Sequence, residues 1–425
     1  MHLRRIRRPT RPARRLLIAL CVAALGLAYG VETSLAGSEA PGLSKQLSDA
    51  LAVAGLDPAN LSALVVDLNT GSTVFASNST LPLVPASIEK LPIALAALAV
   101  LGPDFRSRTL VLGSGMRRGA VWDGDVYLKG YGDPALPKRD VRRLARVLHS
   151  RGIVQVTGAI IADESYFDSV RTAPGWKPSF FKVYSPPISA LVVNRARKQK
   201  SVVDDPALAA ATAFRNALRK RGVTVDGGVG TGTAPANTIR LARDSSPRLT
   251  RLVGWMNTRS DNFIAEMLLK TLGARVAGMG TTSAGVAVVQ SVLAARGIPL
   301  AGVSIVDGSG LSQWNRLTAT TTVAILRAAR SDPGLSEPFI GSLALAGSSG
   351  TLARRFVDSP GRGRIRAKTG TTALSSALAG FVDDRYAFAI FMNGSHDSPV
   401  NHWLARAAQD RFATALIGAP LAGLP

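Results

Sequence analysis

A serine and a lysine three residues apart, Ser87 and Lys90, are the first pair in the chain whose types and spacing suit chemistry. They come just before the apolar run 91–101, which predicts a helix. Positions i and i+3 share a helix face, so the two side chains can touch. A serine hydroxyl needs a base beside it, and a lysine serves only where burial or nearby positive charge lowers its pKa. The pair predicts an activated serine, although a capping serine followed by an unrelated lysine has the same pattern.

Two further short motifs follow this pair along the chain. The first is Ser260-Asp261-Asn262 and the second is Lys368-Thr369-Gly370-Thr371. Each is weak alone, but S-x-x-K, S-D-N and K-T-G in this order are the known signature of β-lactamases and penicillin-binding proteins. The ordered set therefore predicts acyl transfer by a serine enzyme.

Acyl transfer at an amide needs a nucleophile, a base, an acid for the leaving amine and an oxyanion hole. We assign Ser87 as the nucleophile and Lys90 as the base. The Ser260 hydroxyl can pass a proton to the leaving nitrogen. The Asn262 amide can hold Lys90 or the substrate amide.

The third motif suits recognition of the substrate. The charge of Lys368 and the hydroxyl of Thr369 match a carboxylate, and Gly370 lets a substrate backbone lie against an edge strand. The backbone N–H groups of Ser87 and Thr371 are expected to form the oxyanion hole. A charged Lys368 close to the base would also favour the neutral form of that base.

Apolar periodicity predicts an α/β (α+β) fold around these motifs. Strands at 61–68 and 72–76, joined by the turn Asn69-Thr70-Gly71, follow a helix at 42–56 and precede the Ser87 helix. This order favours an antiparallel sheet flanked by helices. The other expected elements are helices at 247–258, 263–272, 283–296, 318–331 and 402–416 and strands at 365–368, 376–383 and 386–393.

Residues 108–240 separate the first motif from the second and have their own α/β pattern. Strands are expected at 121–128, 153–162 and 223–229, and helices at 137–151 and 206–221. We therefore expect one domain in two parts, 37–107 and 241–425, that is interrupted by a smaller inserted α/β domain, 108–240.

The N-terminal segment predicts export. The first fifteen residues contain seven arginines and no acid, and residues 16–31 are uncharged and mostly apolar. This run is short for a membrane span, which needs about 20 residues. We expect residues 1–36 to be a signal peptide cleaved after Ala36 or an uncleaved N-terminal anchor, and the protein to be periplasmic or on the wall side of the membrane. The sole cysteine, Cys21, lies in this run, so no disulfide is expected in the mature chain.

The formal net charge is +23. Attraction to an anionic wall polymer or membrane surface is one explanation, and an ordinary solvated basic surface is an equal alternative. The chain has no nucleic-acid motif, so nucleic acid is not an expected partner.

Further segments match a known family. They are Asp123-Gly124-Asp125-Val126-Tyr127-Leu128, Gly132-Asp133-Pro134, Pro174-Gly175-Trp176, Ala265-Glu266, Asp307-Gly308-Ser309-Gly310-Leu311-Ser312, Asn315-Arg316 and Arg366-Ala367. With the three motifs, they make the chain resemble the D-alanyl-D-alanine carboxypeptidase/endopeptidases of the penicillin-binding protein 4 type (low-molecular-mass class C) over nearly all of residues 42–412.

That resemblance implies a β-lactamase/transpeptidase-like domain with an insertion. It also implies cleavage of peptidoglycan stem peptides outside the cytoplasm by a serine-type carboxypeptidase, acylation by β-lactams, and no metal or cofactor. The balance between carboxypeptidase and endopeptidase action stays open. The short segment between Arg197 and Asp205 predicts that the family's third domain is missing or vestigial. Gln313 and Thr372 depart from the family pattern near the side-chain pocket, so recognition of the third stem-peptide residue stays open.

Two alternatives compete with this interpretation. A class A β-lactamase would have a much shorter gap than the 173 residues from Ser87 to Ser260, and a separate loop that carries a glutamate. The second alternative is a catalytically degenerate wall-binding protein. The intact motif set argues against it, because a binding protein has no need of all these residues.

A Ser-His-Asp triad from Ser395, His396 and Asp397 is disfavoured, because triad members are neighbours in space and seldom in sequence. His396 and His402 have no third ligand nearby, so a zinc site is not expected.

Overall fold

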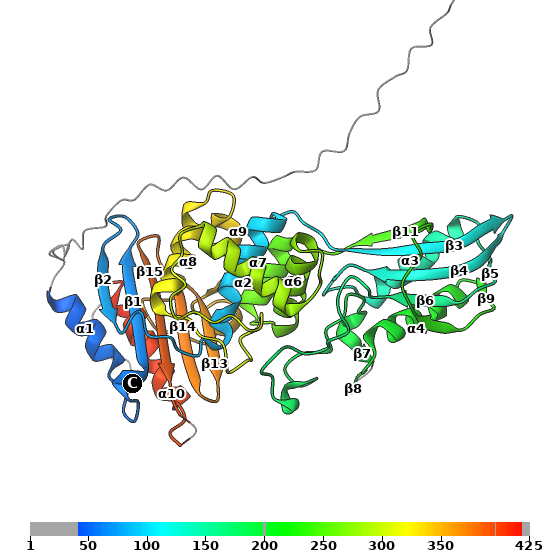
Figure 1. Ribbon diagram of the computed structural model, residues 1–425. Helices are drawn as coiled ribbons and strands as arrows, with labels where there is room; N and C mark the ends of the chain where they lie inside the picture. The colour runs from blue at the N-terminus through cyan, green and yellow to red at the C-terminus, as the bar shows by residue number, and fades with distance from the viewer. Residues whose placement is uncertain (1–40, 199–200, 396, 419–425) are drawn as a thin grey trace, which may run out of the picture. The chain divides into compact units, whose positions relative to one another are not determined.

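The computed structural model of the protein describes residues 41–198, 201–395 and 397–418. Two large sheets and a short hairpin, β7 (Arg197–Lys198) and β8 (Ser201–Val202), make up its strands. The expected α/β architecture, with helices packed against an antiparallel sheet, is confirmed (Figure 1).

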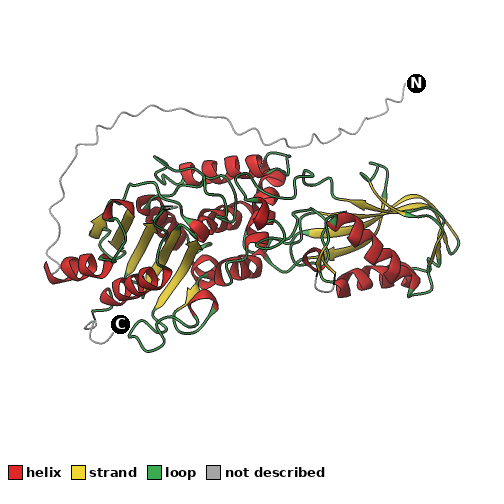
Figure 2. Cartoon of the chain, turned by 90° about the horizontal axis from the view of Figure 1, so that it is seen from below, coloured by secondary structure: helices red, strands yellow, loops and turns green. Residues whose placement is uncertain are grey.

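Six antiparallel strands form the first sheet, in the order β12-β13-β14-β15-β1-β2. Its central strands β14 (Ser375–Val382) and β15 (Tyr386–Asn393) are buried along their whole length, because helices cover both faces (Figure 2). Successive side chains alternate between the two faces, so Leu378 belongs to one core and Ala377 to the other. The other strands are β1 (Leu61–Asp67), β2 (Thr73–Ser77), β12 (Ala344–Leu345) and β13 (Ile365–Thr372).

The helices divide between these two cores. The smaller core packs α1 (Pro41–Leu51) and α10 (His402–Ala415) against the sheet. The larger core surrounds α2 (Lys90–Leu101), whose residues 90–98 are all buried, so this helix is apolar on every side apart from Lys90. The helices packed around α2 are α5 (Leu249–Thr258), α6 (Asn262–Val276), α7 (Thr282–Ala295), α8 (Ala319–Ser331) and α9 (Ser336–Ser342).

The second sheet has its own hydrophobic core, which α3 (Lys138–Ser150) and α4 (Pro206–Arg219) cover. Its order is β10-β6-β4-β3-β11, and β5 and β9 continue it beside β4. The β3–β4 and β3–β11 pairs are antiparallel, whereas β4–β6 and β6–β10 are parallel. The strands are β3 (Arg108–Arg118), β4 (Val121–Gly130), β5 (Gln155–Val156), β6 (Ile160–Asp163), β9 (Thr224–Val225), β10 (Val229–Thr231) and β11 (Ile239–Ser245).

The second sheet departs from the expected elements in three places. The strand expected at 153–162 is two short strands, β5 and β6. Between them lies Gly158, whose backbone passes so close to that of Gly124 that a Cβ would lie 2.5 Å from it. The strand expected at 223–229 likewise breaks into β9 and β10. Strands β3 and β11 were not expected, and β11 runs across the boundary placed at residue 240.

Differences in the rest of the chain are smaller. The N-terminal helix ends at Leu51, short of the expected residue 56, and α9 was not expected. None of the helices in the described part of the chain is long and apolar enough to cross a membrane. The predicted export segment, residues 1–36, lies outside the described residues.

Candidate active site

Ser87 lies in a 3-10 turn, Ala86–Glu89, that leads directly into α2. Ala86 has a φ of +47°, a strained conformation for a residue with a side chain. Two glycines make room for this turn. A Cβ on Gly310 would lie 1.9 Å from the carbonyl oxygen of Ala86, and one on Gly370 would lie 2.6 Å from that of Pro85. The close approach of the Pro85 carbonyl oxygen is therefore a structural reason for glycine at position 370, and the sequence alone did not reveal it.

The Lys90 side chain is fully buried beneath this turn. Its Nζ lies 2.9 Å from Ser87 Oγ and 2.8 Å from Asn262 Oδ1, and it also donates to the carbonyl oxygen of Ser309. A neutral amine has two N–H donors and one lone pair. If the Asn262 and Ser309 oxygens keep the two donors, the lone pair faces the Ser87 hydroxyl. The contacts therefore suit a base that removes the Ser87 proton.

Burial lowers the pKa of Lys90 to about 8, against the opposing effect of the negative charges of Asp307 and Glu266. Burial also lowers the pKa of Lys368 well below its usual value, and the positive charge of Lys90 adds to that shift. The repulsion that we expected between the two lysines therefore acts on Lys368, whereas burial is what favours neutral Lys90.

Lys368, on β13, is also fully buried and meets the second motif. Its Nζ donates to Ser260 Oγ at 2.9 Å and to the carbonyl oxygen of Thr369 at 2.7 Å. Ser260 has a φ of +57° in the turn between α5 and α6. Asp261 caps α6 by accepting from the N–H of Ile264 at 3.1 Å. The loop thus brings the Ser260 hydroxyl to the side-chain nitrogen of Lys368.

The Asn262 side chain is held at both ends. Its Oδ1 accepts from Lys90, and its Nδ2 donates to the carbonyl oxygen of Tyr184 at 3.0 Å. These two contacts orient the amide so that its oxygen faces the lysine. Of the two partners that the sequence suggested for this amide, the structure brings Lys90 into contact.

Beyond Ala367, the outer edge of β13 is unpaired among the described residues, since β12 pairs only with Arg366 and Ala367. The Ile365 carbonyl oxygen accepts from the N–H of Ala346 on the outer, β12 side of β13. Along a strand, the backbone N–H and C=O groups of successive residues point alternately to its two sides. The N–H and C=O groups of Thr369 and Thr371 therefore face the open edge. The Thr369 hydroxyl contacts Thr351 Oγ1 at 2.8 Å. An extended peptide could pair along this edge.

Buried acids lie close to the lysine. Burial raises the pKa of Glu89 well above its usual value, and neither carboxyl oxygen has a hydrogen-bond partner among the described residues. Burial, together with the charge of Asp307, raises the pKa of Glu266 to about 8. Glu266 accepts from the N–H groups of Gly308 and Ser309, at 3.0 and 2.8 Å. This acid therefore supports the loop whose carbonyl oxygen holds Lys90.

Asp307 organises the same loop. Its carboxylate accepts from the N–H of Gly310 at 2.8 Å, from Asn315 Nδ2 at 2.7 Å and from Trp176 Nε1 at 2.8 Å. Glu266 supports this loop through its contact with the Gly308 N–H. Sequence reasoning missed Ser309, Tyr184 and Glu89 as neighbours of the site. Ser309 and Tyr184 contact Lys90 and Asn262 through main-chain carbonyl oxygens, which any residue type has.

The structure brings Ser87, Lys90 and Asn262 into one hydrogen-bonded group, and Ser260 and Lys368 into a second. Thr369 joins the second group through its carbonyl oxygen. No group of three or more metal-ligating side chains is found in the described ranges. His396 lies outside those ranges.

Comparison with known proteins decides the family. The profile of the D-Ala-D-Ala carboxypeptidase 3 (S13) family matches residues 43–204 and 195–416. The chain belongs to this family. The predicted resemblance is confirmed, and with it the assignment as a hydrolase of the D-alanyl-D-alanine carboxypeptidase type.

Relatives of this S13 chain carry matching names. A D-alanyl-D-alanine carboxypeptidase of Actinomadura sp. (strain R39) is 33% identical over 447 residues, covering 85% of this chain and 82% of that protein. A carboxypeptidase of Mycobacterium tuberculosis is 33% identical and covers 86% of this chain and 82% of its own length. The crystal structure of penicillin-binding protein 4 from Haemophilus influenzae superposes with a TM-score of 0.78 at 23% identity, over 88% of this chain and 98% of that one. That structure supports the fold of the S13 chain.

Proposed function

We propose that this S13 carboxypeptidase removes the terminal D-alanine from peptidoglycan stem peptides through an acyl-enzyme on Ser87. The contact of Lys90 Nζ with Ser87 Oγ at 2.9 Å is the observation that carries the proposal. Burial lowers the pKa of that amine to about 8, so a useful fraction is neutral near physiological pH.

In the proposed acylation, Ser87 Oγ attacks the carbonyl carbon of the penultimate residue and its proton passes to Lys90. The N–H groups of Ser87 and Thr371 stabilise the oxyanion. The outward direction of the Thr371 N–H on the open edge of β13 supports this assignment.

In the next step the C–N bond breaks and the leaving amine takes a proton from Ser260. The contact of Ser260 Oγ with Lys368 Nζ supplies a donor from which the hydroxyl can regain its proton. We assign Lys368 and Thr369 to the terminal carboxylate of the substrate, and Gly370 and Thr371 to the strand that pairs with it. The Ser87 proton held on Lys90 then passes to the Ser260–Lys368 group, which replaces the proton given to the leaving amine and makes Lys90 neutral again. Water attacks the ester carbonyl as Lys90 takes its proton, and the ester bond breaks as that proton passes to Ser87 Oγ.

We further propose that β-lactams acylate the same serine, because a lactam carbonyl presents the same reaction to Ser87. One relative by fold, the Haemophilus influenzae penicillin-binding protein 4, has been solved with a bound β-lactam.

The substrate lies outside the cytoplasm, so the protein is proposed to be exported, with residues 1–36 as a signal peptide or anchor. The second sheet and its separate core support an inserted domain over about residues 108–245.

Intact-mass analysis after incubation with benzylpenicillin tests the proposal. Wild type is compared with Ser87→Ala and with Ser291→Ala, a control at an exposed serine of α7. We expect one stable adduct of one drug mass on wild type and Ser291→Ala, and none on Ser87→Ala. Release of D-alanine from a D-Ala-D-Ala peptide should follow the same pattern.

Other outcomes favour the alternatives. Steady drug hydrolysis without an adduct would indicate a β-lactamase. Neither an adduct nor hydrolysis would favour a wall-binding protein with an inactive site. An adduct that persists in Ser87→Ala would place the nucleophile elsewhere. Cleavage of a cross-linked dimer into its two stem peptides, in addition to release of D-alanine from a linear peptide, would add endopeptidase action to the same site.

A further inference from the structure

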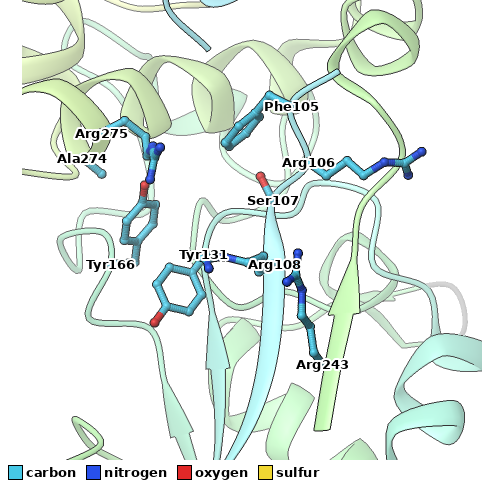
Figure 3. Close-up of a pocket in the computed structure, with 9 residues that line it drawn as sticks. All are labelled: Phe105, Arg106, Ser107, Arg108, Tyr131, Tyr166, Arg243, Ala274 and Arg275. Carbon is cyan, nitrogen blue, oxygen red and sulfur yellow. The ribbon is translucent and has the colours of Figure 1, made fainter. Parts of the chain in front are cut away.

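A pocket of about 410 Å³ lies where the second sheet meets α6 (Figure 3). Its walls come from the ends of three neighbouring strands, β11, β3 and β4, and from the last turn of α6. This size accommodates a small ligand. The arginines and tyrosines that line it are Arg106, Arg108, Arg243, Arg275, Tyr131 and Tyr166.

The four arginines have no acid to neutralise them. Among the described residues, none of their guanidinium groups has a carboxylate within 4 Å. The two acids next to the pocket in sequence are paired elsewhere, Asp104 with Arg248 and Asp244 with Arg143. The Arg106 guanidinium points away from the other three and donates to the carbonyl oxygen of Ser246 at 2.7 Å (Figure 3). The other three unneutralised cations around the cavity create a strong field for an anion.

Strand register brings these cations together. Leu110 pairs with Arg243 and Arg108 with Ser245, so Arg108 and Arg243 are diagonal neighbours on one face of the sheet. The Tyr131 N–H donates to the carbonyl oxygen of Arg108 at 3.0 Å, and the Arg108 guanidinium lies 5.2 Å from the Tyr131 ring centre. Like charges in this position cost stability unless a ligand offsets their repulsion.

An unsatisfied hydroxyl is a second, independent feature of this pocket. Ser107 lines it and is 2% exposed, and its Oγ has no hydrogen-bond partner among the described residues. Buried hydroxyls are normally hydrogen-bonded, so an unpartnered one at the wall of a cationic cavity indicates a missing acceptor.

We propose that this pocket binds a phosphate ester group. Guanidinium groups match phosphate oxygens in bidentate geometry, and a phosphate has enough acceptors for several arginines and a hydroxyl at once. The pocket is separate from the active site: Asn262 begins α6 and Arg275 lies in its last turn, roughly 20 Å away at 1.5 Å per residue. The ligand is a phosphate carried on an anionic polymer or the free anion, and both would use the same groups.

Isothermal titration of the full chain with three probes tests this inference: inorganic phosphate, a glycerol phosphate oligomer and polyglutamate of similar charge. Wild type is compared with Arg243→Ala/Arg275→Ala and with a control, Arg219→Ala/Arg327→Ala, which removes two exposed arginines outside the pocket. We expect saturable binding of a phosphate probe, weakened about tenfold or more in the pocket variant and unchanged in the control.

Binding of inorganic phosphate would identify the free anion as sufficient, and binding of the oligomer alone would identify the polymer. Equal binding of polyglutamate would overturn the phosphate assignment, and equal loss in both double variants would overturn the pocket as the site. Absence of phosphate binding to wild type would also overturn it. Benzylpenicillin acylation should be unchanged in the pocket variant, which confirms its folding and separates this result from that of the proposed function.

Discussion

Charged side chains are buried in two regions of this chain, and the two regions hold them in opposite ways. In the second sheet they are paired: Asp163 accepts from Lys129 at 2.8 Å. Burial by itself would raise the pKa of Asp163, but its hydrogen bonds from Lys129 and Ser165 outweigh burial and lower it. Around Ser87, by contrast, neither Lys90 nor Lys368 has a described carboxylate within 4 Å, and burial lowers both pKa values.

The difference separates structural charges from reactive ones. A buried ion pair with further hydrogen bonds stays ionised and fastens loops to strands. A buried amine without an ion partner is held near its neutral form, which is what proton transfer requires. The four predictions below test whether that division holds, beginning with the largest expected effect.

Replacing Lys90 by methionine should remove the base and keep the fold. We expect acylation by benzylpenicillin to fall by about a thousandfold, within the range for loss of a general base. Stability should change little, because relief from burying the charge offsets the loss of the hydrogen bonds to the Asn262 and Ser309 oxygens. Acylation kinetics and thermal unfolding measure the two quantities.

Lys270→Met is the matched control. Lys270 is also fully buried, but it pairs with Asp168. This variant should lose stability and, in its folded fraction, retain acylation. Similar behaviour of the two lysine variants would contradict the division between paired and unpaired charges.

Asp163→Asn should affect stability alone. Asp163 accepts from Lys129, from Ser165 and from the N–H of Ala234, and breaking a buried pair costs about 3 kcal/mol. Its folded pKa lies below the unfolded value, so its stabilisation is present above the unfolded pKa and lost as pH falls through the folded one. Wild type should therefore lose this stability below about pH 4, and the variant should lack that part of the acid dependence. Denaturant unfolding between pH 2 and 7 measures both, and unchanged stability at pH 7 would refute the prediction.

The rate of acylation should rise with pH up to about 8 and then level off. Burial lowers the pKa of Lys90 to about 8, and only the neutral amine accepts the Ser87 proton. Below that value the rate should change about tenfold per pH unit. Glu266 has a raised pKa of about 8 as well, so Glu266→Gln is the control. If the inflection disappears in that variant, the acid and not the lysine controls the profile.

Trp176→Phe should have the smallest effect. It removes only the hydrogen bond from Nε1 to Asp307, at 2.8 Å, which contributes about 1 kcal/mol. The loop that holds Lys90 through the Ser309 carbonyl keeps its other contacts with Asp307. We expect a loss of acylation of less than about fivefold, measured beside Trp403→Phe, an exposed tryptophan on α10. A loss as large as that of Lys90→Met would show that this contact is essential to the site.

The sequence alone predicted the three motifs, their chemistry, the family and most helices of the first core. These features are local: a helix such as α2 shows as an apolar run, and Ser87 and Lys90 are close because they are three residues apart. The hairpin of β1 and β2 was also readable from its turn. Physical chemistry over a short span is enough for such features.

Tertiary structure decided the rest. Asn262 and Lys90 are 172 residues apart in sequence, and their contact exists because α6 packs against α2. Strands β5 and β9 have only two residues each, which is too short for an apolar period in the sequence, and they are recognised only by their backbone pairing. The acceptor role of the Ser309 carbonyl and the arginine pocket have the same origin. Main-chain oxygens and the convergence of distant like charges carry no signature of residue type, because only packing brings them to one point.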